Sequence, residues 1–258
     1  MSSPVPQRAF TVDRLKVEIH PTATAMGAAA AAQVATHLRA LLAAQKEVAA
    51  IFASATSQLQ FLDALVAAGD IDWSRVTLFH MDEYLGISAG HPASFRRFMR
   101  ERMESRLPLR AFHYLAGDAP EPLRECRRYA GLLAQQPPDF CCLGIGENGH
   151  IAFNDPPVAD FEDPDPVKLV RLDARCRRQQ VGEGCFPSLD QVPQYAYTLS
   201  IPALLRPKRL FCIVPDERKA DAVRDTLRGP IAPACPASIL RRHPDATLFL
   251  DAPAARRL

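Results

Sequence analysis

The segment 141–157, CCLGIGENGHIAFNDPP, places an ionisable side chain where the chain could have made a plain turn. His150 follows Gly149 directly, and the carboxylate of Asp155 comes five residues later. A histidine with a carboxylate partner can accept and donate a proton near neutral pH. A hydrogen-bonded structural histidine is the alternative, but a glycine-rich approach and a polar exit are typical of loops that carry chemistry. We therefore expect His150 to move a proton and Asp155 to orient its ring.

Two adjacent acids, Asp82 and Glu83, follow another apolar run in HMDEYLG at 80–86. Acids at the end of a strand are common in the rims of catalytic sites. Asp82 is positioned to serve as a general base, and Glu83 is expected to fix a loop. An ordinary turn with two solvated acids is the alternative.

Small hydroxylated residues follow a third apolar run, in FASATSQ at 52–58. Backbone N–H groups and hydroxyls at the start of a helix suit a phosphate. Ser54, Thr56 and Ser57 are therefore candidate phosphate ligands, although they would also serve simply as helix caps.

Cationic residues further along the chain are candidates for the same anion. Lys219 falls in the first turn of a predicted helix, where the helix dipole disfavours a cation unless an anion joins it. A solvated lysine is the default alternative. An arginine group could also present a cationic face to a sugar phosphate, or form a solvated helix face: Arg175, Arg177 and Arg178.

These segments are far apart in sequence, so the fold must bring them together. Apolar runs predict strands at 48–54, 76–82, 140–146, 209–215 and 246–251, and periodicity predicts helices at 57–69, 92–103, 121–136 and 217–229. The Ala-rich MGAAAAAQVATHL predicts another helix, capped by Thr22 or Thr24. This alternation indicates an α/β fold: a three-layer, Rossmann-like, mostly parallel sheet with helices on both faces. Ligands bind beyond the carboxyl ends of such strands, so the segments that carry the candidate site residues should lie together at one edge of the sheet.

Composition narrows the class of protein. A length of 258 residues with no convincing linker predicts a single domain, 1–258, in which 154–167 is a long irregular loop. A formal charge of +2 argues against a general nucleic-acid binder. No run approaches the roughly 20 apolar residues of a membrane span, and MSSPVPQRAF lacks a signal-peptide core. Seven irregularly spaced cysteines favour reduced thiols and a cytoplasmic location.

Taken together, these segments resemble the glucosamine-6-phosphate deaminase family, part of a larger group with sugar-phosphate isomerases and lactonases. The similarity runs from roughly residue 13 to residue 251. Its most specific part is the signature G-x-G-x-x-GHIAFN, present at 144–154. Three weaker motifs occur in the same order along the chain as in the family. They are MDEY at 81–84, before the signature, and QVP at 191–193 and PASIL…HP at 236–244, after it.

The resemblance implies an aldose–ketose isomerisation coupled to loss of ammonia, which would convert glucosamine 6-phosphate to fructose 6-phosphate. It implies that Asp82 is the base, that His150 assists ring opening, that Lys219 lies on the phosphate side, and that no metal or organic cofactor is needed. The predicted catalytic residues are Asp82, Asn148, His150 and Asp155, and the predicted substrate-binding residues are Ser54, Thr56, Ser57, Glu83, Gly149 and Lys219.

The chain departs from the family pattern around the same site. Asn148 stands where the family commonly has Asp, and Asp155 where it often has Glu. The segment 55–58 replaces paired glycines and Thr-Pro. The arginine that the family places near the phosphate falls on or near Gln180, unless a register shift brings Arg178 there. These changes leave the identity of the sugar phosphate open.

Two other functions stay open. One is an isomerase or lactonase that acts on a different sugar phosphate, and the other is a non-catalytic sugar-phosphate sensor. Only about a dozen residues precede the first predicted element, too few for the DNA-binding module of a regulator. The expected partner is thus a small sugar phosphate, without nucleic acid or membrane, and a homo-oligomer is left open.

Overall fold

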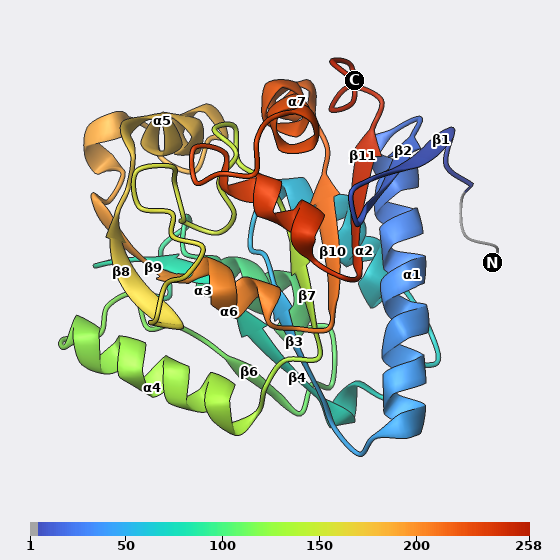
Figure 1. The fold of residues 1–258 in the computed structure, drawn as a ribbon. Coiled ribbons are helices and arrows are strands. Elements are labelled where there is room, and N and C mark those ends of the chain that lie inside the picture. The colour runs from blue at the N-terminus through green and yellow to red at the C-terminus, as the bar shows by residue number, and fades with distance from the viewer. Residues whose placement is uncertain (1–4) are drawn as a thin grey trace.

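Figure 1 shows the computed structural model, which describes residues 5–258. The helices are α1 (Ala23–Ala44), α2 (Leu59–Val66), α3 (Phe95–Met99), α4 (Pro122–Gln135), α5 (Ala174–Gly182), α6 (Ile201–Leu205) and α7 (Ala220–Arg228). The strands are β1 (Arg8–Val12), β2 (Leu15–His20), β3 (Val48–Phe52), β4 (Val76–His80), β5 (Asp82–Tyr84), β6 (Ala111–His113), β7 (Phe140–Leu143), β8 (Val167–Arg171), β9 (Tyr195–Leu199), β10 (Arg209–Val214) and β11 (Ala246–Asp251).

A large central sheet has the strand order β1-β2-β11-β10-β7-β3-β4-β6. Its strands are parallel to their neighbours except for β1, which pairs antiparallel with β2. The predicted mostly parallel sheet is therefore confirmed, and every strand predicted from an apolar run lies in it.

Helices cover both faces of this sheet, as predicted. Side chains alternate along each strand, so one face of the sheet packs on α1 and α2, and the other on α4, α6 and α7. In β3, for example, Val48 and Phe52 contact the α1 and α2 side, and Ile51 contacts the opposite side. This arrangement is the three-layer architecture expected from the sequence.

A small antiparallel sheet, β5-β9-β8, lies beside the large one and was not predicted. The run predicted as one strand at 76–82 divides at Met81, so β4 ends at His80 and Asp82 begins β5. Buried Asn154 ties the loop after β7 to the small sheet, because its amide Nδ2 donates to the carbonyl of Leu199 in β9 at 2.9 Å. The N–H of Phe153 also donates to Thr198 Oγ1 at 3.1 Å.

The helix boundaries correct several details. Thr22 is the cap of α1, because its Oγ1 accepts a hydrogen bond from the N–H of Ala25 at 3.1 Å. The helix predicted at 92–103 begins after Ser94, its cap, so Pro92 precedes the helix instead of lying in its first turn. Lys219 ends a short 3₁₀ turn, Glu217–Lys219, immediately before α7. It therefore sits at the entrance of the helix.

The remaining sequence expectations concern the loop and the surface. Segment 154–167 is irregular apart from its last residue, which begins β8. All seven cysteines fall within the described residues and each is free. Within residues 5–258 the helices are too short or too polar to span a membrane. Residues 1–4, part of the segment expected to lack a signal peptide, lie outside the described residues.

Candidate active site

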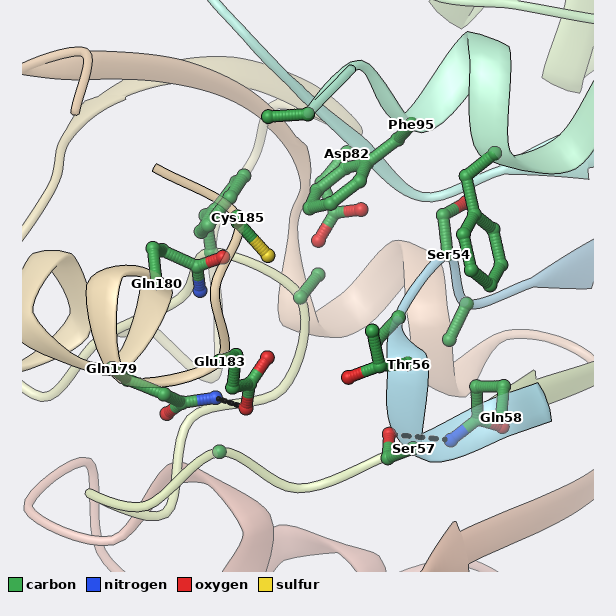
Figure 2. Close-up of a pocket in the computed structure, with 18 of the residues that line it drawn as sticks. Ser54, Thr56, Ser57, Gln58, Asp82, Phe95, Gln179, Gln180, Glu183 and Cys185 are labelled. Carbon is green, nitrogen blue, oxygen red and sulfur yellow. Dashed lines mark hydrogen bonds between the residues drawn. The ribbon is translucent and has the colours of Figure 1, made fainter. Parts of the chain in front are cut away.

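A cavity of about 270 Å³ opens beyond the carboxyl ends of the central strands. Figure 2 shows ten of its residues by name. The lining comes from five stretches and one lysine: Ala53 to Gln58; Met81 and Asp82; Pro92 to Phe95 with Phe98; Gly144 to Gly146 with His150, Ala152 and Phe153; Gln179 and Gln180 with Glu183 to Cys185; and Lys219. The segments that carry the candidate site residues thus meet at one edge of the sheet, as predicted. Of the predicted site residues, the cavity brings together Ser54, Thr56, Ser57, Asp82, His150 and Lys219.

Asp82 points its carboxylate into the cavity beside the ring of Phe95 (Figure 2). Its backbone belongs to β5, which pairs with β9, so the small sheet fixes its position. Burial, and then the neighbouring charge of Glu83, raise the pKa of Asp82 well above its ordinary value.

Glu83 turns away from the cavity, as expected for alternate residues of a strand. Its buried carboxylate accepts hydrogen bonds from Ser94 Oγ at 2.7 Å, and from the N–H groups of Tyr84 at 3.0 Å, Phe95 at 3.2 Å and Arg96 at 3.0 Å. It thereby holds the first turn of α3 against β5. Its expected loop-fixing role matches this geometry, whereas its predicted place among the substrate contacts does not.

His150 lines the cavity and belongs to a compact polar group whose other members, Asn148 and Asp155, lie behind the cavity wall. Its Nδ1 lies 2.9 Å from Asp155 Oδ1. Asn148 bridges the two residues: its Nδ2 donates to Asp155 Oδ1 at 2.9 Å, and its Oδ1 accepts from the N–H of His150 at 3.1 Å. Burial raises the pKa of Asp155, but the contacts with His150 and Asn148 outweigh burial and leave it below the ordinary value. Asn148 and Asp155 therefore act on the cavity through His150.

Two glycines of the signature make room for this group. A side chain at Gly146 would lie 2.1 Å from the ring of His150, so only glycine admits the imidazole there. Gly149 has φ +83°, a conformation that other residues rarely adopt, and a Cβ would lie 2.8 Å from Cys235 Sγ. Gly149 was predicted to bind substrate, but it is not part of the cavity wall. It shapes the turn that presents His150.

One side of the cavity combines the segment 54–57, called the hydroxyl loop below, with the buried side chain of Lys219. Ser54 Oγ is buried and has no hydrogen-bond partner among the described residues. Gln58 donates to Ser57 Oγ at 3.2 Å and to the carbonyl of Ile213 at 3.1 Å, which ties this loop to β10. Lys219 is only 4% exposed, and its Nζ lies 3.3 Å from Glu183 Oε1.

The arginine group does not form the predicted cationic face. Arg175 donates to the carbonyl of Glu147 at 3.1 Å, and Arg177 donates to the carbonyls of Leu189 and Val192 at 2.6 and 2.8 Å. Neither these two nor Arg178 belongs to the cavity wall. Gln180 lines the cavity instead, and its Oε1 accepts a hydrogen bond from Tyr84 at 2.6 Å.

Sequence reasoning missed several wall residues in and after α5. They are Gln179, Glu183, Gly184 and Cys185, together with Gln58, which directly follows the hydroxyl loop. The sequence of α5, ARCRRQQVG, has too few apolar residues to show which face of the helix is buried. The one available signal was the QQ pair at 179–180, near the position expected for an arginine.

One group of side chains in the described residues could hold a metal ion. Ligand atoms of His150, Asp155 and Cys176 lie within 4.8 Å of one another, and all three residues are buried. Asp155 Oδ1 already receives the amide of Asn148, and burial raises the pKa of Cys176 well above its ordinary value. A protonated thiol is a poor metal ligand, so these donors suit a proton relay better.

Comparisons with known proteins match this chain to a family of sugar-phosphate enzymes. A family model described as glucosamine-6-phosphate isomerases/6-phosphogluconolactonase matches residues 21–249. The glucosamine-6-phosphate deaminase of Listeria innocua is 34% identical over 197 residues, which are 76% of this chain and 82% of that protein. The deaminase of an Exiguobacterium species is 36% identical over 187 residues, 72% of each chain.

Solved structures agree with the sequence comparisons. A monomeric glucosamine-6-phosphate deaminase has a TM-score of 0.85 and 28% identity, and the match covers 94% of this chain and 99% of that one. A 6-phosphogluconolactonase from Thermotoga maritima has a TM-score of 0.74 and 18% identity over 92% of this chain and 99% of that one. The second comparison shows a shared fold.

Proposed function

The chain belongs to the glucosamine-6-phosphate isomerase/6-phosphogluconolactonase family, and we propose that it converts glucosamine 6-phosphate to fructose 6-phosphate and ammonia. Its relatives named as deaminases, at 34–36% identity over most of the chain, support this reaction. The observation that carries the proposal is the single cavity lined by the carboxylate of Asp82, the imidazole of His150 and the ammonium of Lys219. These groups are a base, a proton carrier and an anion-binding cation.

Asp82 would be the base of the isomerisation. It takes the proton from C2 of the open-chain amino sugar and returns it to C1, so the C1 carbonyl is reduced as C2 is oxidised. The resulting C2 imine takes up one water and releases ammonia, which leaves a ketose. The raised pKa of Asp82 makes its carboxylate a stronger proton acceptor, and the entry of a polar substrate supplies hydrogen bonds that favour the ionised form.

His150 would open the sugar ring before this step. Ring opening removes a proton from the C1 hydroxyl and adds one to the ring oxygen, and an imidazole can perform both transfers. Asp155 lies against Nδ1, which leaves Nε2 on the other side of the ring for the substrate. Asn148 fixes Asp155 and the backbone of His150 together, so it is a positioning residue.

The phosphate would lie between the hydroxyl loop and Lys219. Thr56 and Ser57 begin a short 3₁₀ turn that leads into α2, and Ser54, whose buried Oγ has no hydrogen-bond partner among the described residues, lines the same cavity. Backbone N–H groups at such a turn, two or three hydroxyls and one ammonium are the donors that a phosphate ester prefers. The phosphate then orients the distant C1 and C2 atoms for proton transfer.

The proposal includes a single-domain, cytoplasmic enzyme that acts on a small sugar phosphate without a nucleic-acid or membrane partner. Seven free cysteines, five of them buried, support a reducing compartment. The reaction needs no organic cofactor, because the substrate's own carbonyl acidifies the proton at C2.

The test is the release of ammonia from glucosamine 6-phosphate, with fructose 6-phosphate measured in parallel. The two products should appear in equal amounts, and Asp82→Asn protein is the control. Other amino-sugar phosphates and 6-phosphogluconolactone belong in the same panel, because the family also includes lactonases. Hydrolysis of the lactone without ammonia release would reject the deaminase and indicate a lactonase. Tight binding of a sugar phosphate without any turnover would indicate a sensor.

A further inference from the structure

Glu183 places a carboxylate inside the cavity that we assign to a phosphate ester. It follows α5 as its C-terminal cap, and its side chain is only 8% exposed. Figure 2 shows its carboxylate and the hydroxyl of Thr56 pointing toward each other across the cavity. Gln179 Nε2 donates to Glu183 Oε1 at 2.7 Å, so the carboxylate is held in place.

The same oxygen is the charge partner of Lys219. Nζ of Lys219 lies 3.3 Å from Glu183 Oε1, and the lysine is 4% exposed. A buried ammonium needs an anion nearby, and in this structure Glu183 supplies it. The cation that would attract a phosphate is thus already neutralised by the protein itself.

A phosphate dianion and Glu183 cannot both pair with Lys219 without cost. At separations of a few ångströms in a partly buried site, like charges repel by several kcal/mol before relaxation. The substrate must therefore displace the carboxylate from Lys219 or bind more weakly. A carboxylate that contacted the sugar directly would have the opposite effect, since its removal would weaken binding.

We propose that Glu183 is a specificity-determining residue that competes with the substrate's phosphate for Lys219 and so sets the affinity of the phosphate subsite. The inference rests on the proposed function, because the ligand is taken to be a phosphate ester. It assigns to Glu183 two consequences: lower affinity for every phosphate, and a smaller preference for phosphorylated over unphosphorylated sugars.

Glu147 offers a matched control. It lies near the same cationic region as Glu183, since both carboxylates raise the pKa of Arg218. Its Oε1 is 4.0 Å from Arg218 Nη1, and the residue is not part of the cavity wall. Glu147→Gln therefore removes one negative charge from the neighbourhood and leaves the Lys219 pair intact.

The experiment is calorimetric titration of the full chain with inorganic phosphate at pH 8, where phosphate is largely a dianion. Glu183→Gln should bind phosphate about tenfold more tightly than the parent, a change of about 1.4 kcal/mol. Glu147→Gln should stay within about twofold, and adding Lys219→Ala to Glu183→Gln should abolish the gain. Unchanged or weaker binding by Glu183→Gln would overturn the inference. Glu183→Ala, expected to shift in the same direction, decides the matter if the glutamine variant does not fold.

The titration separates this inference from the proposed reaction, because it needs no turnover. If the parent enzyme releases ammonia, the Glu183→Gln enzyme should have a KM for glucosamine 6-phosphate about tenfold lower than that of the parent. The KM of the Glu147→Gln enzyme should stay near that of the parent. Tighter phosphate binding without ammonia release would retain the inference and reject the deaminase. Ammonia release with no gain in phosphate binding would retain the deaminase and reject the inference about Glu183.

Discussion

Glu83→Gln is the substitution that best separates positioning from substrate contact at this site. Each carboxylate oxygen of Glu83 accepts two hydrogen bonds. Oε1 accepts from the N–H groups of Tyr84 and Phe95, and Oε2 accepts from Ser94 Oγ and the N–H of Arg96. A glutamine keeps one oxygen, so in either orientation its NH₂ group faces two donors. If the NH₂ group faces Tyr84 and Phe95, two buried N–H donors lose their acceptor; if it faces Ser94 and Arg96, the N–H of Arg96 loses its acceptor, while the hydroxyl of Ser94 can turn and accept from the amide.

The expected loss of stability follows from the donors that lose their acceptor. Each unsatisfied buried donor costs about 1–3 kcal/mol, and the neutral amide regains part of this because it is cheaper to bury than a carboxylate. The net destabilisation should be about 2–3 kcal/mol. For a chain of this size, 1 kcal/mol lowers Tm by about 2–4 °C, so Tm should fall by about 4–12 °C.

Two readouts test the reasoning. Thermal unfolding followed by circular dichroism gives Tm, with the exposed Glu101→Gln as the control that should change it by less than about 2 °C. The acid limb of the pH–rate profile should also move to lower pH, because the charge of Glu83 contributes to the raised pKa of Asp82. An unchanged Tm together with a KM raised tenfold or more would refute the positioning role and make Glu83 a substrate contact.

Three further predictions concern the proton-transfer groups. Asp82→Asn should lower turnover by about 10²–10⁴ and raise Tm at pH 8, since a carboxyl with a raised pKa costs stability as the pH rises above about 4; turnover within a few-fold of the parent would contradict its role as base. His150→Gln should slow the cyclic substrate far more than an open-chain analogue, and equal losses in kcat/KM would mean that it does not open the ring. Asn148→Asp replaces the amide that donates to Asp155 Oδ1 with a second carboxylate, which raises the pKa of Asp155 and pushes it away from this position. We expect kcat/KM for the cyclic substrate to fall in this variant and in Asp155→Asn, and unchanged kcat/KM in both variants would show that this group takes no part in the reaction.

The sequence predicts the central layer of this fold well, because its strands are buried on both faces. Such strands are continuous apolar runs, for example VAAIF in β3, and they are recognisable without any partner. The small sheet has no such signal. β8, VKLVR, mixes buried and exposed positions, and its pairing partner β9 lies about thirty residues away. Its existence depends on tertiary contacts that a local pattern does not contain.

The candidate site shows the same division. Asp82, His150 and the hydroxyl loop follow apolar strands, so the rule that strand ends share a rim was enough to place them in one cavity. Glu83 and Gly149 were misassigned, because sequence adjacency to a site residue does not say which way a side chain points. Glu183 was missed, because nothing in the local sequence shows that α5 ends against Lys219.

The amide of Asn154 ties the loop of His150 to the sheet that carries Asp82. Its Nδ2 donates to the carbonyl of Leu199, and the N–H of Leu199 donates in turn to the carbonyl of Met81 at 2.8 Å. The segments that carry His150 and Asp82 are therefore coupled through β9. In hydrogen-exchange experiments, the amides of 151–154 and of β9 should be protected together and exchange through one shared opening, because neither segment can separate without breaking these bonds. Local opening would then separate both segments from the cavity at once, and states in which only one of them is displaced would be rare in the native ensemble.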